Sequence, residues 1–168
     1  MQDAITSILN KYDLAGQYLD TIAINEIGHY FSSVSDRIRI IEIINSESKK
    51  IIQEAAAQLY AEQEELLRPG GNSYTTRRYS ACLRDIEYYL RYATYALIAN
   101  STNILNERLL DGLKDTYNSL GVPIGPTVRS MQILQDIIIE KAGKEENIKK
   151  IINEPFSHMI NILSEKNI

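Results

Sequence analysis

The chain has 168 residues and a formal net charge of −4, from 18 Lys+Arg against 22 Asp+Glu. This length fits one domain with a core of its own, and the acidic balance excludes general nucleic-acid binding, which depends on excess positive charge. The single cysteine excludes an internal disulfide and a multi-cysteine metal site. No apolar run reaches the ~20 residues of a membrane span, and the first residues do not resemble a secretory signal. We therefore expect one soluble intracellular domain, residues 1–168.

Apolar residues recur at helical spacing along almost the whole chain. A first helix is expected to begin after Asp3 as N-cap and to end at Gly16. A second helix should end at residues 45–48, where a serine caps a third helix that continues through Tyr60. Residues 68–73, with one proline and paired glycines, predict a loop.

The next helix is expected to be capped by Thr75 or Thr76 and to end near residues 100–101. Leucines from Leu105 onwards then predict a helix that Gly121 closes. These residues continue the 3.6-residue spacing, so no strand is expected in this part of the chain.

Residues 121–126 predict a rigid turn, followed by a helix that ends near Gly143. A last helix contains Pro155, which we expect to kink or divide it. The numerous isoleucines fall at helical spacing and do not alternate as in a strand. The chain is therefore predicted to be all-α, with about seven or eight helices.

The common catalytic motifs are absent from the sequence, which has no HExxH, no P-loop, no G-x-G-x-x-G and no G-x-S-x-G. His29 and His158 are the only histidines, and a Cys–His nucleophile pair or a haem site would need one of them. Neither histidine has an apolar pocket pattern around it, so both are interpreted as surface or half-buried side chains, and no metal site is predicted.

Residues 72–95 carry an unusual concentration of tyrosines and arginines around the only cysteine. At about 100° per residue, one helix flank gathers a thiol, a carboxylate, a guanidinium and two phenols. This flank consists of Arg78, Cys82, Asp85, Tyr89 and Tyr92. The opposite side holds Arg77, Arg84, Tyr88, Arg91 and Tyr95.

The first flank suits a flat ligand that has its own acids and N–H donors, with a guanidinium for its carboxylate and aromatic walls. Two other interpretations remain open. Cys82 can be a small buried hydrophobe, the commonest fate of a free cysteine. A helix rich in arginine and tyrosine is also common at protein–protein surfaces.

Residues 68–85, 88–96 and 116–125 resemble the chromophore region of phycobiliprotein β subunits, those of allophycocyanin in particular. Residues 58–68 are similar to a minor β-type subunit of the phycobilisome core. The resemblance implies a globin-like helical domain with an N-terminal helical hairpin extension, approximately residues 1–30.

The resemblance extends from Met1 to about Gly143. The tail that follows, residues 144–168, does not resemble the usual allophycocyanin C-terminus and has no cysteine for a second pigment. The frequent use of Ile, Asn and Lys fits an AT-rich genome, which favours a red-algal plastid over a cyanobacterium as the source.

The resemblance implies a light-harvesting subunit whose Cys82 carries one open-chain tetrapyrrole, phycocyanobilin, through a thioether. It assigns Asp85 as hydrogen-bond acceptor for the inner pyrrole nitrogens. Arg78 and Arg84 are implied to pair with the propionates, with Arg77 as a further candidate. Because the wheel places Arg84 off the Cys82 flank, its side chain would have to bend round.

The resemblance implies further site residues around this pigment. Asn72 corresponds to an asparagine that the family often methylates on its side-chain amide, although a Gly-Gly-Asn sequence is also ordinary turn chemistry. Tyr89, Tyr92 and Tyr117 are implied to line the pocket.

The resemblance also implies assembly with other phycobiliproteins. The expected partner is an allophycocyanin α-type subunit or the α-like domain of the core–membrane linker, followed by closure into ring trimers with linker polypeptides. Interface positions are matched by Asp3, Asp13, Tyr18, Arg91 and Tyr95. The assembly would associate peripherally with the stromal face of the thylakoid membrane, and an Asp13–Arg91 pair between subunits is one hypothesis for the contact.

Two alternatives to a pigment-bearing subunit stay open. The chain can be a structural subunit of the same assembly that carries no pigment. It can also be a redox or sensory helical protein that uses Cys82 as a thiol.

Overall fold

The computed structural model describes residues 2–164. Residue 1 and residues 165–168, which belong to the predicted domain, lie outside the described residues. The described residues form helices and no strand, so the prediction of an all-α chain is confirmed.

The helices follow one another with short connections. The first half of the chain forms α1 (Ala4–Ala15), α2 (Thr21–Glu62), the 3₁₀-helix η1 (Glu64–Leu67) and α3 (Thr76–Ala99). The second half forms α4 (Asn103–Leu105), the π-helical segment η2 (Asn106–Leu110), α5 (Leu113–Leu120), α6 (Ile124–Ala142) and α7 (Glu146–Ser164).

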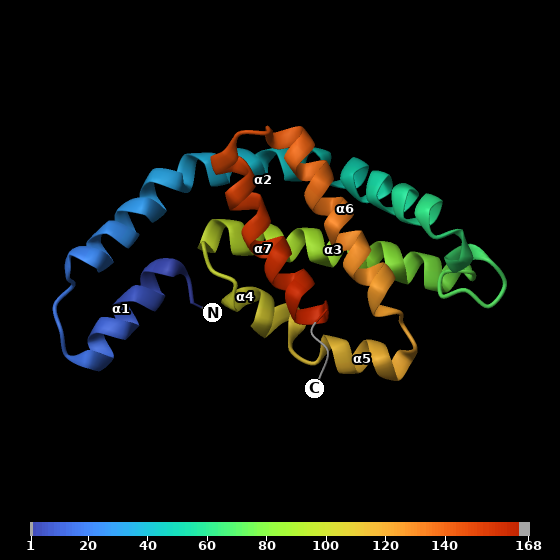
Figure 1. Ribbon diagram of the computed structural model, residues 1–168, viewed down its shortest axis with the longest axis horizontal. Helices are drawn as coiled ribbons and strands as arrows, with labels where there is room; N and C mark the ends of the chain where they lie inside the picture. The colour runs from blue at the N-terminus through green and yellow to red at the C-terminus, as the bar shows by residue number, and fades with distance from the viewer. Residues whose placement is uncertain (1, 165–168) are drawn as a thin grey trace.

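The core lies where α6 and α7 cross the pair formed by α2 and α3 (Figure 1). Each of these helices contributes a stripe of apolar side chains that is almost fully buried. The most deeply buried of them include Ile40, Ile44, Ile51, Leu97, Met131, Leu134, Ile138 and Phe156. Helix α3 contacts α2, α4, η2, α6 and α7, so it is the helix around which much of the fold is arranged.

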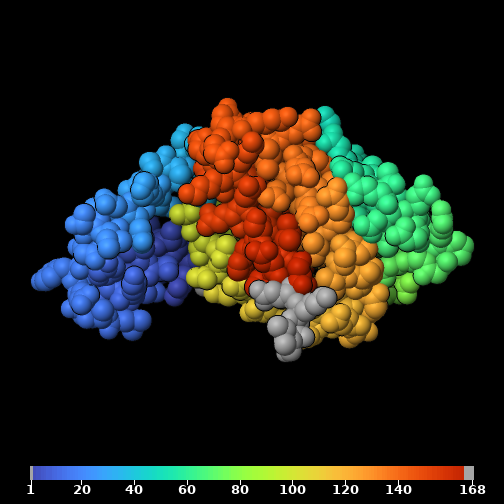
Figure 2. Space-filling model, in the orientation of Figure 1, coloured from blue at the N-terminus to red at the C-terminus, as the bar shows by residue number. Residues whose placement is uncertain are grey.

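The N-terminal arm, α1 with the beginning of α2, projects from this body (Figures 1 and 2). Asp3 caps α1 by accepting a hydrogen bond from Thr6 N at 2.7 Å, and Gly16 ends the helix in the left-handed conformation, as predicted. No residue of α1 is buried, and Tyr18 in the turn is 99 % exposed. The arm therefore presents apolar surface that the rest of the chain does not cover.

Helix α2 is continuous, so the predicted break at residues 45–48 is wrong. The Ser46 hydroxyl donates to Ile43 O at 3.0 Å and the Ser48 hydroxyl donates to Asn45 O at 3.4 Å. Both serines thus bond to the preceding helical turn and do not cap a new helix. The burial of Ile44 and Ile51 on either side keeps the helix on the core.

Two further predictions of helix boundaries are wrong. The helix expected from Leu105 to Gly121 is divided at Gly112, which has φ 74° and starts α5. Pro155 was expected to kink or divide its helix, and division is wrong, because Ile152 and Phe156 on either side are fully buried and hold the continuous helix α7 on the core.

The loop between η1 and α3 is held by backbone hydrogen bonds. Gly71 N donates to Arg68 O at 2.8 Å, and Ser73 N donates to Leu66 O at 2.9 Å. A Cβ atom on Gly71 would lie 2.3 Å from the carbonyl oxygen of Glu65. The loop therefore packs backbone against backbone, which places its last residues at the start of α3.

We predict that Gly71→Ala lowers the free energy of unfolding by about 2 kcal/mol, because its methyl group meets backbone atoms that cannot move freely. Gly28→Ala is the matched control: nothing lies within 4 Å of its added Cβ. It should raise the unfolding free energy by about 1 kcal/mol through helix propensity. Urea unfolding followed by circular dichroism measures both, and an unaffected Gly71→Ala protein would contradict the close packing.

Candidate functional site

A cavity of about 490 Å³ lies along one side of α3. Its walls come from the end of α2, the loop before α3, α3 itself, α5 and the beginning of α6. Most of the lining is apolar, and the polar groups come mainly from the loop and α3. This combination of an apolar wall with a few convergent polar groups is typical of small-molecule sites.

Most of the residues singled out from the sequence line this cavity. They are Asn72, Arg77, Arg78, Cys82, Asp85, Tyr89 and Tyr117. Arg84 and Tyr92 are not among the lining residues. Cys82 and Asp85 lie one helical turn apart on the same wall, so a group bonded to the sulfur would pass the carboxylate.

Sequence reasoning missed part of the lining. The additional residues are Leu59, Leu66, Ser73, Thr75, Ala81, Ile86, Leu120, Val122, Pro123, Pro126, Thr127 and Ser130. Val122, Pro123 and Pro126 belong to this wall. The sequence predicted a rigid turn at residues 121–126, which did not show what the turn packs against; helix α6 begins within it, at Ile124.

Two tyrosine hydroxyl groups in series connect to Asp85 by hydrogen bonds from the side of α5. Tyr117 Oη donates to Asp85 Oδ2 at 3.0 Å, and Tyr89 Oη and Tyr117 Oη hydrogen-bond to each other. Tyr89 is 3 % exposed, and burial raises the pKa of both phenols well above the usual value. Both hydroxyls therefore remain protonated and serve as hydrogen-bond donors at neutral pH.

The arginines divide into two kinds. Arg84 Nη2 lies 3.3 Å from Asp85 Oδ1, so its side chain does bend towards the carboxylate, although it remains largely exposed. Within residues 2–164, the guanidinium groups of Arg77 and Arg78 have no ion-pair partner. Two unpaired guanidinium groups at the edge of a cavity suit a ligand with carboxylates of its own.

Cys82 is a free, half-buried thiol in the cavity wall. Burial is the main cause that raises the pKa of this thiol. A buried thiol of this kind is mostly protonated at neutral pH and needs neighbouring donors to react as a thiolate.

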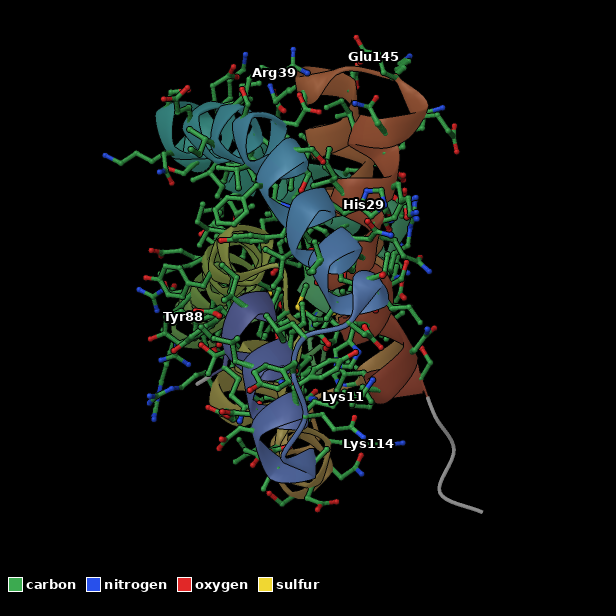
Figure 3. All side chains as sticks on the ribbon, turned by 90° about the vertical axis from the view of Figure 1, so that its left-hand side faces the viewer. Lys11, His29, Arg39, Tyr88, Lys114 and Glu145 are labelled. Atoms are coloured by element: carbon green, nitrogen blue, oxygen red, sulfur yellow. The ribbon has the colours of Figure 1, made fainter. Side chains whose placement is uncertain are left out.

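The opposite side of α3 carries an exposed cluster of rings and cations. The Arg91 guanidinium lies 4.7 Å from the Tyr88 ring centroid and 5.6 Å from that of Tyr92. Tyr92 and Tyr95 meet edge to face at 5.7 Å, so Tyr92 belongs to this cluster. Tyr88 lies at the edge of the molecule in Figure 3, in keeping with a surface open to a partner.

Neither histidine lines the cavity. His29 is exposed on α2 (Figure 3), and His158 Nε2 is 2.7 Å from Asn106 Oδ1. In the part of the chain that the structure describes, His, Cys, Asp and Glu residues form no group of three or more suited to a metal ion. No helix among the described residues is long and apolar enough to cross a membrane.

The cavity thus brings together one nucleophile, one oriented carboxylate and two unpaired guanidinium groups, backed by aromatic and apolar walls. A thiol can attach a ligand covalently, the carboxylate can accept hydrogen bonds from N–H groups, and the guanidinium groups can bind carboxylates. The arrangement suits an elongated ligand with N–H donors in its centre and acids at its edge.

Comparison with known proteins finds one matching family and several similar chains. The family described as phycobilisome protein matches residues 7–163. Red-algal relatives named "Allophycocyanin subunit beta-18" are 65 % identical in Pyropia yezoensis and 64 % identical in Porphyra purpurea, over 100 % of both chains. The cyanobacterial relative of the same name from Nostoc sp. is 52 % identical, again over 100 % of both chains.

We predict that Tyr117→Phe lowers the unfolding free energy of the pigment-free protein by about 1–3 kcal/mol, because Tyr89 Oη is left buried without its partner. Tyr88→Phe is the matched control and should change it by less than about 0.5 kcal/mol, since Tyr88 is exposed. Guanidinium unfolding measures both variants. Equal stability of the two would show that the hydroxyl chain contributes nothing.

Proposed function

Because the chain belongs to the phycobilisome protein family, we propose that it carries one phycocyanobilin on Cys82 and passes the absorbed energy on within the phycobilisome core. Membership makes it a light-harvesting subunit, not an enzyme, with the globin-like all-α fold of the family. We assign residues 1–168 to one domain, in which residues 1–30 approximately form the assembly hairpin.

The observation that carries the pigment proposal is the wall formed by Cys82 and Asp85. Their side chains face the same cavity one helical turn apart. A bilin attached to Cys82 through a thioether would then have its next ring beside the Asp85 carboxylate. Phycocyanobilin supplies the absorption of red light, and the protein supplies orientation and electrostatic tuning.

Asp85 has the role of hydrogen-bond acceptor for the pyrrole N–H groups. Tyr117 already donates to Asp85 Oδ2, which fixes the plane of the carboxylate. Arg84 Nη2 is close to Oδ1 but exposed, so it can turn away from the carboxylate towards a propionate. Hydrogen bonds that the pyrrole N–H groups donate to a fixed carboxylate keep the ligand from twisting, and twisting is how a free bilin loses its excitation energy.

The propionates are assigned to Arg78 and Arg84, with Arg77 as a further partner. The unpaired state of Arg77 and Arg78 at the cavity supports this assignment, because each has its donors free. Tyr89 and Tyr117 form the deep wall of the cavity, whereas Tyr92, which was expected to line it, lies in the cluster with Arg91. Methylation of Asn72, at the cavity edge, would remove one N–H donor next to the pigment.

Assembly with an allophycocyanin α-type subunit, or with the α-like domain of the core–membrane linker, is assigned to the arm and the exposed side of α3. Asp3, Asp13 and Tyr18 lie on or next to α1, whereas Arg91 and Tyr95 lie on α3. The arm exposes apolar side chains, which supports the proposal that a partner subunit covers this surface in the assembly.

Pairs of this kind would close into ring trimers with linker polypeptides at the stromal face of the thylakoid. Phycobilisome proteins associate with thylakoids, and the similarity to red-algal relatives favours a plastid source.

We predict that Cys82→Ser abolishes the covalent pigment and leaves the helix content unchanged, because the residue is half-buried and the two side chains have similar size. Zinc-enhanced fluorescence on a denaturing gel and far-ultraviolet circular dichroism measure the two effects in protein co-expressed with the pigment. Arg108→Ser, an exposed substitution on η2, is the control and should keep the pigment. A Cys82→Ser protein that is still fluorescent, or a wild-type protein with no pigment, would contradict the proposal and favour a pigment-free structural subunit.

We predict that Arg91→Glu weakens pairing with the α-type subunit, because it reverses the charge that is proposed to meet an acidic side chain such as Asp13 of a neighbour. Lys49→Glu makes the same charge change at an exposed site on α2 and is the control. Sedimentation velocity measures pairing of both variants. Unchanged assembly of Arg91→Glu would exclude Arg91 from the interface.

A further inference from the structure

Tyr60, on α2, has a buried hydroxyl group that the fold leaves unpaired. The residue is 7 % exposed, and within residues 2–164 its Oη has no hydrogen-bond partner of good geometry. Its ring stacks on that of Tyr79, with 5.3 Å between the centroids and an interplanar angle of 24°. Burying a hydroxyl without a partner is costly, so an unpaired hydroxyl of this kind points to an acceptor, such as an anion, that forms beside it in use.

The polar side chains beside the Tyr60 hydroxyl are those of Cys82 and Ser73. Both line the cavity, whereas Tyr60 does not. Ser73 is 3 % exposed and is held in place by the bond from its N to Leu66 O. Because Tyr79 precedes Cys82 by one helical turn, the Tyr60 ring that stacks on Tyr79 lies against the part of α3 that carries the thiol. The Tyr60 hydroxyl therefore has the Cys82 sulfur as a neighbour on the side of the cavity wall away from the cavity.

We propose that the Tyr60 hydroxyl, assisted by that of Ser73, is the donor that holds the Cys82 sulfur and stabilises its thiolate while the pigment is attached. This role rests on the proposed attachment of a bilin to Cys82. Tyr60 is a positioning residue, because it acts on the sulfur and does not line the cavity that receives the pigment.

The attachment step balances without an oxidant or reductant. The thiolate adds to the ethylidene substituent on the terminal ring of an open-chain tetrapyrrole, and a C–S bond forms while the C=C π bond breaks. The electron pair of that bond takes up one proton, which replaces the proton lost from the thiol. A hydroxyl that donates to the sulfur favours the ionised state from which this addition starts.

Other groups around the sulfur either raise the pKa of the thiol or lie farther away in the cavity. Burial and the neighbouring Asp85 carboxylate raise the pKa of the Cys82 thiol, and the Tyr60 and Ser73 hydroxyls lower it. Tyr89 and Tyr117 reach the same cavity as neutral phenols, and the Arg77 and Arg78 guanidinium groups stand at its edge, where a bilin's acids would occupy them.

The first test uses the pigment-free full-length protein and measures the rate of Cys82 alkylation by iodoacetamide across pH. Tyr60→Phe should shift the profile to higher pH and slow alkylation about tenfold below the thiol pKa, since a hydrogen bond to a charged group is lost. Tyr88→Phe, which removes an exposed phenol hydroxyl from the same chain, should match the wild type. Circular dichroism checks that the variants are folded.

Ser73→Ala provides an independent variant. We expect it to shift the pH profile of alkylation in the same direction as Tyr60→Phe, by a smaller amount. A Tyr60→Phe profile identical to that of the wild type would overturn the proposal. If Tyr60→Phe does not fold, a Ser73→Ala profile identical to that of the wild type has the same consequence.

The second test adds free phycocyanobilin to the same proteins and follows covalent attachment by intact mass. Tyr60→Phe should attach the pigment several-fold more slowly, with the initial non-covalent binding unchanged, because the cavity lining is intact. Attachment to Tyr60→Phe at the wild-type rate would overturn the role of Tyr60 and leave the proposed function standing. A wild-type protein that takes no pigment at Cys82 would overturn the proposed function, and the alkylation profile would still decide whether Tyr60 bonds to the sulfur.

Discussion

The hydrogen bonds from Tyr89 through Tyr117 to Asp85 are the contact on which the geometry of the site depends. They join α3 to α5 through two buried phenols and set the distance between the helix that carries the thiol and the wall opposite it. Because the last acceptor in this chain is the carboxylate at the cavity surface, one set of contacts both closes the fold and orients the group that meets a ligand. The loop that Gly71 packs against η1 fixes the other end of α3.

Features set by neighbours in the chain were predictable from sequence. The cap of α1 at Asp3 and the cap of α3 at Thr75 each depend on a hydrogen bond to a backbone N–H three residues away. The common wall of Cys82 and Asp85 follows from helical spacing alone. The same reasoning failed for Ser46 and Ser48, because a serine hydroxyl can bond within a helix as well as cap one, and only the buried stripe of the long helix decides between the two.

Features that depend on distant parts of the chain were not predictable in this way. The partner of Tyr89 comes from α5, and the wheel gave no means of choosing Tyr117 over another tyrosine. Tyr92 was placed on the thiol flank by its angle, yet its ring contacts Arg91 and Tyr95 on the exposed side. Tyr60 carries no signal at all in its own segment, since its importance comes from the thiol that α3 brings to it.

The central claim is that this cavity holds one bilin, bound through the only thiol of the chain and oriented by Asp85. Intact-mass measurement together with a visible spectrum of the protein from its native source tests it most directly. The claim predicts a chain heavier by one bilin, located on the Cys82 peptide, and a strong absorption band in the red. An unmodified mass with a free thiol and no visible absorption would contradict it.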